Sequence, residues 1–174
     1  MDKRIIHIAV LFVTILLAQI LIFNHILLFG IAAPLVLVYF IVRTPIDMGT
    51  NILLTLSFLL GLAVDICSDT PGLNALACTL TAVVKKPVFY AYVQHDDRMK
   101  GITPNILTLG LADYCKYLFT ITGIFSFLVF SIEYFSFADI KEIFILTLGS
   151  TALTFLLLLG TDSLVTIRHD RRSK

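Results

Sequence analysis

The sequence predicts an all-α fold, a polytopic transmembrane bundle of about six helices that makes up a single integral membrane domain over residues 1–174. Hydrophobic residues make up 58% of the chain and charged residues only 14%, and the mean hydropathy is +0.95. A soluble domain carries about 25% charged residues, so this chain has too little polar surface to cover a water-soluble body of its length. The ionisable residues also gather in short clusters between long apolar blocks.

Six apolar blocks are separated by these clusters, and each is expected to form one helix that crosses the bilayer. A crossing of the hydrocarbon core, about 30 Å thick, takes about 20 residues. The first block follows Lys3 and Arg4, and its length and lack of a cleavage site favour a retained helix over a signal peptide. Pro34 falls inside the second block, where it can kink one helix or begin a shorter, re-entrant one, which would leave five spans. The approximate spans are 5–23, 26–42, 50–66, 71–87, 106–131 and 143–167.

The fourth block has a short apolar stretch, because Lys85, Lys86 and Pro87 follow it closely. We expect this span to end near Pro87, with the two lysine side chains extending to the lipid headgroups. Tyr90 and Tyr92 would then lie at the membrane surface, where tyrosine is enriched.

The basic residues predict the orientation of the bundle. With the N-terminus in the cytoplasm, eleven of the 13 Lys and Arg residues fall in cytoplasmic segments, whereas the external loop 133–142 is acidic. By the positive-inside rule, this bias favours an even number of spans with both termini cytoplasmic. The eleven basic residues assigned to the cytoplasm are Lys3, Arg4, Arg43, Lys85, Lys86, Arg98, Lys100, Arg168, Arg171, Arg172 and Lys174.

The longest polar stretch, 94–101, is too short to form a domain of its own.

The turn between the third and fourth spans is the most specific segment of the sequence. Gly61 precedes Asp65 by four residues, so both lie on one face of the third helix, and a glycine there lets another backbone approach closely. An unpaired carboxylate about one turn below the external surface is costly, so Asp65 should meet a donor. Asn74 and the free backbone N–H groups at the start of the fourth helix are the candidates. The candidate structural or partner-binding residues of this turn are Gly61, Asp65, Asp69, Pro71, Gly72 and Asn74.

Two interpretations of Asp65 remain open: a carboxylate that binds a partner or an ion, and a structural clamp that ties the third helix to the fourth. The residues around it suit a helix start, because Asp69 or Thr70 can cap the fourth helix and Pro71 fits its first position.

Asp113 and Lys116 form a second pair of intramembrane candidates. They lie three residues apart on the fifth span, so their side chains are neighbours and can neutralise each other. Three interpretations are open: a helix that starts late and places the pair at the cytoplasmic interface, a polar contact to another helix, and a proton or ion relay. Asp162, in the last span near Arg168, is expected to be interfacial.

Motifs for catalysis are missing from the sequence, so neither an enzyme nor a cofactor is expected. The three cysteines and four histidines follow no metal-binding pattern, and we predict no metal site. The net charge of +1 comes without a basic stripe, which argues against nucleic acid as a partner. We expect a lipid bilayer to surround most of the folded chain.

The chain resembles the MreD family of bacterial rod shape-determining membrane proteins over essentially its full length. The sharpest similarity is Gly61-x-x-x-Asp65 followed by the run from Ser68 to Ala75, which reads Ser-Asp-Thr-Pro-Gly-Leu-Asn-Ala. Many family members carry an extra residue between the proline and the glycine, whereas Pro71 and Gly72 are adjacent here.

The resemblance implies a non-enzymatic scaffold of the cell-wall elongation machinery in the bacterial inner membrane. Such a protein binds an MreC-like bitopic membrane protein and, through it, an MreB-like filament, a RodA-like glycosyltransferase and a penicillin-binding transpeptidase. The family fold is similar to the substrate-binding subunit of energy-coupling-factor transporters. The alternative is therefore a vitamin-binding membrane subunit, although such a site needs several convergent polar groups and the chain has no Trp to stack on a heterocycle.

Overall fold

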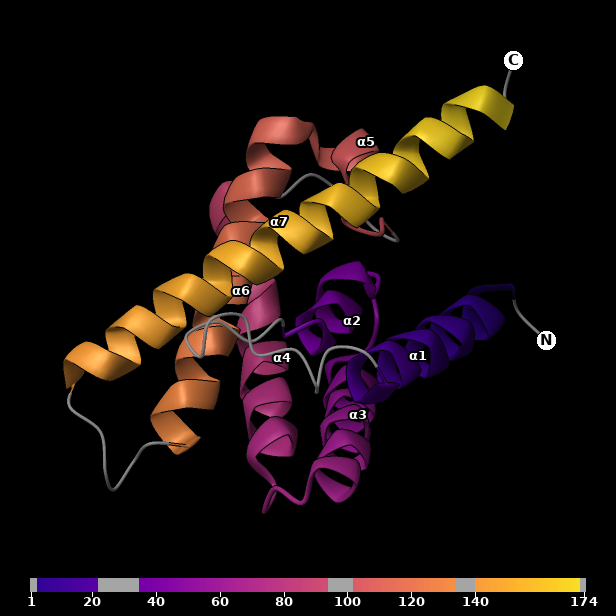
Figure 1. The fold of residues 1–174 in the computed structure, drawn as a ribbon. Helices are drawn as coiled ribbons and strands as arrows, with labels where there is room; N and C mark the ends of the chain where they lie inside the picture. The colour runs from indigo at the N-terminus through magenta and orange to yellow at the C-terminus, as the bar shows by residue number, and fades with distance from the viewer. Residues whose placement is uncertain (1–2, 22–34, 94–101, 134–139, 173–174) are drawn as a thin grey trace.

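The computed structural model describes residues 3–21, 35–93, 102–133 and 140–172. Over these ranges the chain forms helices and no strands, which confirms the all-α class (Figure 1). The helices are α1 (Lys3–Leu21), α2 (Leu37–Arg43), α3 (Thr50–Ser68), α4 (Leu73–Tyr92), α5 (Ile106–Leu109), α6 (Leu111–Glu133) and α7 (Ile140–Arg172).

Among the described residues, three stretches of helix are long and apolar enough to cross a membrane: Thr50–Ser68, Leu111–Glu133 and Ile143–Ser163. They coincide with the third, fifth and sixth predicted spans, so the chain has the character of a membrane protein. A shorter apolar run, Ile6–Leu21, covers most of the first predicted span. The expectation of six crossing helices is not confirmed beyond this.

The second predicted span, 26–42, is only partly within the described residues, and Pro34 lies outside them. The described part forms α2, which has seven residues. At 1.5 Å per residue this helix is about 10 Å long, far short of the roughly 30 Å of a hydrocarbon core. Residues 35–42 therefore do not form a crossing helix, and the short helix there agrees with the other option considered for this block, a shorter helix. Leu37, Phe40 and Ile41 are fully buried, so α2 lies inside the bundle.

Helix α4 continues through Pro87 to Tyr92, so the helix extends beyond the position where the fourth span was expected to end. Pro87 has no backbone N–H to donate to the carbonyl of Val83, and its ring crowds that carbonyl. Pro87 and Val83 are both exposed, so the perturbed turn lies on the outer side of the helix. Lys85 does not extend to the surface either, because it is fully buried.

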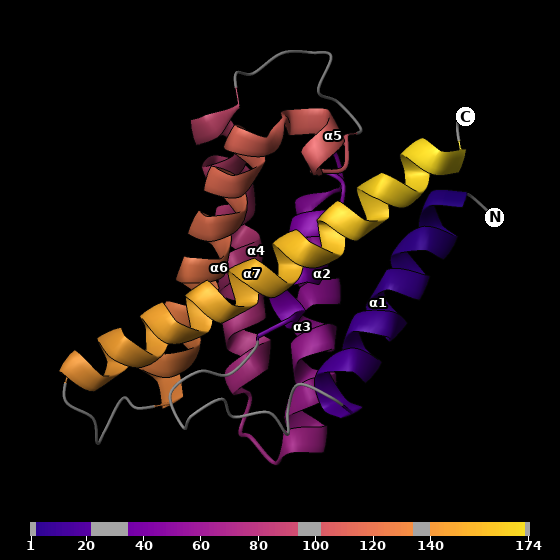
Figure 2. The same ribbon diagram turned by 45° about the horizontal axis from the view of Figure 1, so that its top comes forward.

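The fifth predicted span, 106–131, is interrupted at Gly110, whose φ of 79° ends one helix before the next begins. Asn105 caps the short helix α5 in a reciprocal hydrogen-bond pair with Thr108. Helix α6 then starts at Leu111, which is the late start considered for this span. The sixth span is part of α7, a 33-residue helix that crosses the bundle obliquely (Figure 2).

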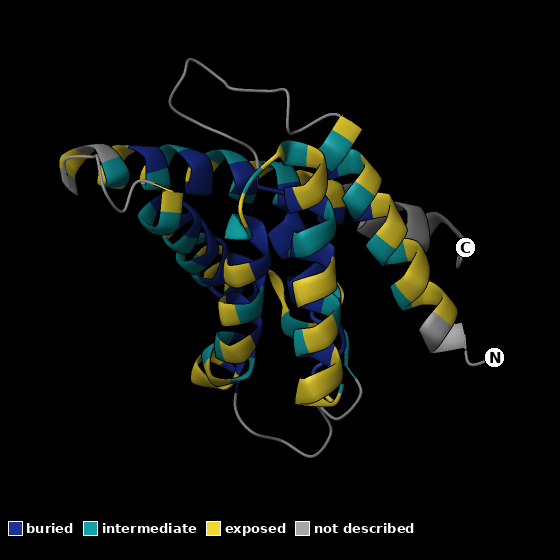
Figure 3. Ribbon diagram, turned by 90° about the horizontal axis from the view of Figure 1, so that it is seen from below, coloured by how far each residue is buried: buried dark blue, intermediate teal, exposed yellow. Residues whose placement is uncertain are grey.

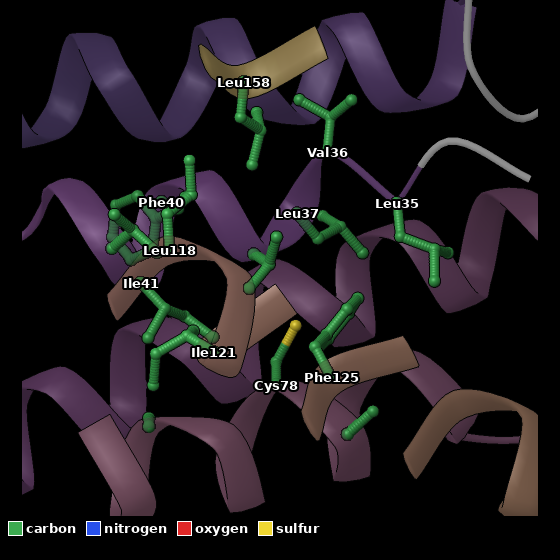
Figure 4. Close-up of a cluster of buried hydrophobic side chains, with 14 of the residues drawn as sticks. Leu35, Val36, Leu37, Phe40, Ile41, Cys78, Leu118, Ile121, Phe125 and Leu158 are labelled. Atoms are coloured by element: carbon green, nitrogen blue, oxygen red, sulfur yellow. The ribbon is translucent and has the colours of Figure 1, made fainter. Parts of the chain in front are cut away.

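The core of the bundle is built around α2. Leu35, Leu37 and Phe40 pack with Ile121 and Phe125 of α6, and Cys78 of α4 and Leu158 of α7 belong to the same cluster (Figure 4). Buried positions face inward and exposed positions face outward along α3 and α4 (Figure 3). The outward face is itself apolar, with Ile52, Phe58 and Leu80 exposed, as contact with lipid requires.

Candidate functional site

Asp65 is the centre of a buried hydrogen-bond network between α3 and α4. Its Oδ1 accepts hydrogen bonds from the Thr70 hydroxyl at 2.6 Å and from the backbone N and side-chain Nδ2 of Asn74, both at 2.9 Å. Its Oδ2 accepts from the backbone N of Ala75 at 2.8 Å. Asp65 is only 2% exposed, so these four donors replace its hydration. We call these residues, together with Gly61, the Asp65 clamp.

The Asp65 clamp caps α4 from the neighbouring helix. The residue before α4 is Gly72, with a φ of 80° and no side chain to accept a hydrogen bond. Asn74 and Ala75 are the second and third residues of α4, and the N–H groups at these positions lack a partner within the helix. Asp65 accepts both, and its negative charge lies at the positive end of the helix dipole.

The residues expected to cap α4 have other roles. Asp69 ends α3 in the left-handed conformation, with a φ of 55°, and Thr70 donates to Asp65. Pro71 lies two residues before the first residue of α4, Leu73, so it does not occupy the first helical position. The prediction of a cap by Asp69 or Thr70 is thus wrong, because Asp65 already supplies the acceptor.

Gly61 allows α3 and α4 to come into backbone contact. A Cβ atom at this position would lie 2.5 Å from the Cα and N of Ala75 and from the carbonyl O of Asn74. These are backbone atoms that cannot swing away, so any side chain would push the helices apart. The predicted close approach at Gly61 and the predicted donors to Asp65 therefore meet at the same two residues of α4.

A second buried carboxylate, Asp162 of α7, lies at the centre of what we call the Asp162 cluster. It accepts hydrogen bonds from the hydroxyls of Tyr39, at 2.5 Å, and of Tyr114. The Nη1 of Arg43 lies 3.6 Å from its Oδ1, and the guanidinium stacks 5.7 Å from the centre of the Tyr39 ring. Asp162 is 2% exposed and has partners on two other helices, α2 and α6, which the expectation of an interfacial residue did not include. Its predicted neighbour Arg168 has a side chain outside the described set.

Polar side chains also satisfy both ends of α2. At its start, the backbone N of Val36 donates to Oε1 of Gln19, and the backbone N of Leu35 donates to the hydroxyl of Thr154, both at 3.0 Å. At its end, the ammonium group of Lys85 donates to the carbonyl O of Thr44 at 2.5 Å. Both ends of α2 are buried in the protein, where water does not reach them, so these side chains satisfy the backbone groups instead. The charge of Lys85 also suits the negative end of the helix dipole.

The sequence analysis missed Gln19, Thr154 and the inward position of Lys85. One signal was available: Gln19 is a large polar residue in the second half of the mostly apolar first block. Such a residue inside a membrane span needs a partner within the protein. Nothing in the sequence showed that its partner is the backbone of residue 36.

Asp113 and Lys116 form the expected ion pair, with 3.2 Å between Oδ1 and Nζ. The break at Gly110 places Asp113 in the first turn of α6, in line with the late-start interpretation. The two side chains are 47% and 59% exposed, so the pair lies on the outward face of α6 rather than in the core.

The geometry gives the two buried carboxylates a structural role. The carboxylates of Asp65 and Asp162 are each surrounded by donors, which suits them to holding helices together.

In comparisons with known proteins, no protein family, no curated protein and no solved structure matches this chain. The resemblance described above therefore rests on the sequence motif alone.

Proposed function

We propose that this protein is a non-enzymatic membrane scaffold of the bacterial cell-wall elongation machinery, an MreD-like protein that takes part in the regulation of cell shape. The observation that carries the proposal is the Asp65 clamp. The positions that give the sequence its resemblance, Gly61, Asp65, Asn74 and Ala75, meet in one contact that fixes the turn between α3 and α4. The residues of the motif thus share one physical role, and this supports the proposal.

In this proposal the bundle binds an MreC-like bitopic protein and helps to organise the peptidoglycan synthases. The bundle lies in the inner membrane with both termini in the cytoplasm, so the turn between α3 and α4 faces outward. A turn held by four hydrogen bonds to one carboxylate is a rigid surface for the stem of such a partner. The MreB-like filament, the RodA-like glycosyltransferase and the penicillin-binding transpeptidase join through that partner.

Depletion of the protein in a rod-shaped host tests the proposal. We expect cells to become wide and round, because wall synthesis along the cylinder loses its membrane organiser. Expression of the wild-type chain from a second locus should restore the rod shape. Normal shape combined with a vitamin requirement would instead support the alternative function in small-molecule uptake.

Co-purification is the second test. Full-length protein, extracted in mild detergent, should retain a tagged MreC-like bitopic partner from the same organism. The matched control is an unrelated bitopic protein with the same tag. Equal recovery of the two partners would reject the scaffold function.

A further inference from the structure

Helices α6 and α7 pack against each other in antiparallel directions, and three pairs of residues fix their register (Figure 2). The pairs are Tyr114 with Asp162, Phe119 with Phe155, and Gly123 with Thr151. From pair to pair the residue number rises along α6 and falls along α7 by similar steps. The same register places Thr122 level with Thr151, and Ser126, one turn further along α6, level with Thr147. We call these four residues the hydroxyl ladder.

Helix geometry turns the two sides of the hydroxyl ladder towards each other. At 3.6 residues per turn, Thr122 lies about 80° around α6 from Tyr114 and about 60° from Phe119, and both of these residues contact α7. Ser126 follows Thr122 by four residues and shares its face. The two threonines of α7 are also four residues apart, so the ladder has two levels about 6 Å apart along the axis.

All four hydroxyl oxygens of the ladder are buried, and none has a hydrogen-bond partner within the described residues. Thr122 and Ser126 are fully buried, and Thr151 is 5% exposed. A buried hydroxyl without a partner lowers the stability of a protein, because it has lost its hydration and gained no hydrogen bond in return. Four such groups in one contact therefore require a partner.

Other threonines of this protein satisfy their hydroxyls within their own helices. Thr55, Thr79 and Thr81 each donate to the carbonyl O of the residue four positions earlier, at 2.9, 2.7 and 2.8 Å. A rotation about χ1 would give the ladder residues the same hydrogen bond. They do not form it, so their hydroxyls stay available between α6 and α7.

We infer that the hydroxyl ladder is a binding site for ordered water molecules that bridge α6 and α7. Water is small enough to reach buried oxygens, and it both donates and accepts, as hydroxyls require. The helices also leave space here: a cavity of about 240 Å³ adjoins Gly123, Thr147 and Thr151. One water takes up about 30 Å³ in the liquid, so a small adjustment of the helices admits several.

Two other occupants suit the ladder less well. A lipid chain would fill the carbon-lined side of the cavity, but it offers no hydrogen bond to the hydroxyls. The ladder itself supplies only neutral oxygens, whereas a cation buried in a protein needs negatively charged ligands. Water bridges would join the two helices by polar contacts that direct packing does not provide.

Threonine-to-valine substitutions test the site, because they remove a hydroxyl and keep the branched shape. We expect Thr122→Val and Thr151→Val each to lower the thermal unfolding midpoint in detergent by about 2–4 °C, since the bound water loses a partner. The double variant should lose less than the sum, because a water without either partner leaves. An unchanged or raised midpoint in the single variants would mean that the ladder is dry, and would overturn the inference.

Thr81→Val is the matched control for the coupling. Thr81 is fully buried, but its hydroxyl is satisfied within α4. Its effect should therefore add to that of Thr151→Val, whereas the effects of Thr122→Val and Thr151→Val should not add. Full additivity in both pairs overturns a shared water.

A crystal structure of the wild-type chain, at a resolution that shows ordered water, gives a readout independent of the variants. We expect water within hydrogen-bond distance of at least two ladder hydroxyls, on both helices. Hydroxyls that instead donate to their own helix carbonyls would overturn the site. So would density that appears only with sodium and disappears in potassium.

Discussion

The bundle buries two carboxylates to the same extent, but their hydrogen-bond donors lie at very different distances along the chain. Asp65 and Asp162 are each 2% exposed. The donors to Asp65 lie five to ten residues away along the chain, in one helix–turn–helix unit. Two donors to Asp162 lie 48 and 123 residues away, in α6 and α2. One site is thus a property of a short segment, and the other exists only in the completed bundle.

The two sites also neutralise their charge differently. Asp65 contacts uncharged donors at the positive end of α4, whereas Asp162 has the guanidinium of Arg43 at 3.6 Å. Loss of Asp65 should leave two backbone N–H groups without a partner at one helix start. Loss of Asp162 should leave a cation with 14% exposure inside the bundle. The second loss should cost more.

The largest effect is therefore expected for Asp162→Ala. It leaves Arg43 without a counter-charge and removes the acceptor of Tyr39 and Tyr114, which should cost about 3–5 kcal/mol of unfolding free energy. Thermal unfolding in detergent, followed by circular dichroism, measures it. An unchanged midpoint would show that the Asp162 cluster contributes nothing net. Asp162→Asn, which keeps the shape and removes the charge, should lose less.

Gly61→Val should rank second. Its side chain would meet the backbone of Asn74 and Ala75 at 2.5 Å and force α3 away from α4. Overpacking of this kind costs about 1–3 kcal/mol and also lengthens the hydrogen bonds to Asp65. The same unfolding assay checks it, with Gly160→Val as the matched substitution at an open position. Similar midpoints for the two valine variants would contradict the close contact.

Asp65→Ala should cost about 1–2 kcal/mol, the range expected when a helix cap is lost. The N–H groups of Asn74 and Ala75 lose their acceptor, but they lie near the end of α4, where the chain can adjust. Hydrogen exchange followed by mass spectrometry should show faster exchange at the start of α4 and no change in α6. Uniform acceleration through both helices would mean that the Asp65 clamp is not local.

Lys116→Gln should have the smallest effect on stability. The pair with Asp113 is half exposed and lies within one helix, so its contribution is about 0.3–0.5 kcal/mol at most. The unfolding midpoint should stay within the error of the measurement. A loss as large as that of Asp162→Ala would show that exposure does not govern the ranking.

The contrast between the two carboxylates also explains what the sequence could and could not predict. Asp65 lies within ten residues of its donors at the start of α4, so helix geometry alone was enough to predict that these donors lie near the carboxylate. The partners of Asp162 depend on how α2, α6 and α7 pack, which hydropathy does not encode. The outward expectation for Lys85 failed for the same reason, since Thr44 O is 41 residues away.

The predicted helix boundaries differ from the observed ones at positions where the backbone conformation, and not apolar length, decides where a helix begins and ends. A late start of the helix in block 106–131 was considered, but hydropathy did not locate it at Gly110, whose φ of 79° separates α5 from α6. The block 26–42 looked long enough to cross, but its described part is the seven-residue α2. Apolar length reports what a segment can do in lipid, and only its packing decides how much of it becomes helix.

The dependence of α2 on distant side chains constrains how the chain is made. The acceptor for Leu35 lies 119 residues downstream, at Thr154, and the acceptor for Tyr39 lies 123 residues downstream, at Asp162. During translation the ribosome delivers residues 35–44 long before it delivers either acceptor. These hydrogen bonds can form only once α7 has been made, so α2 takes its final place late although it comes early in the chain.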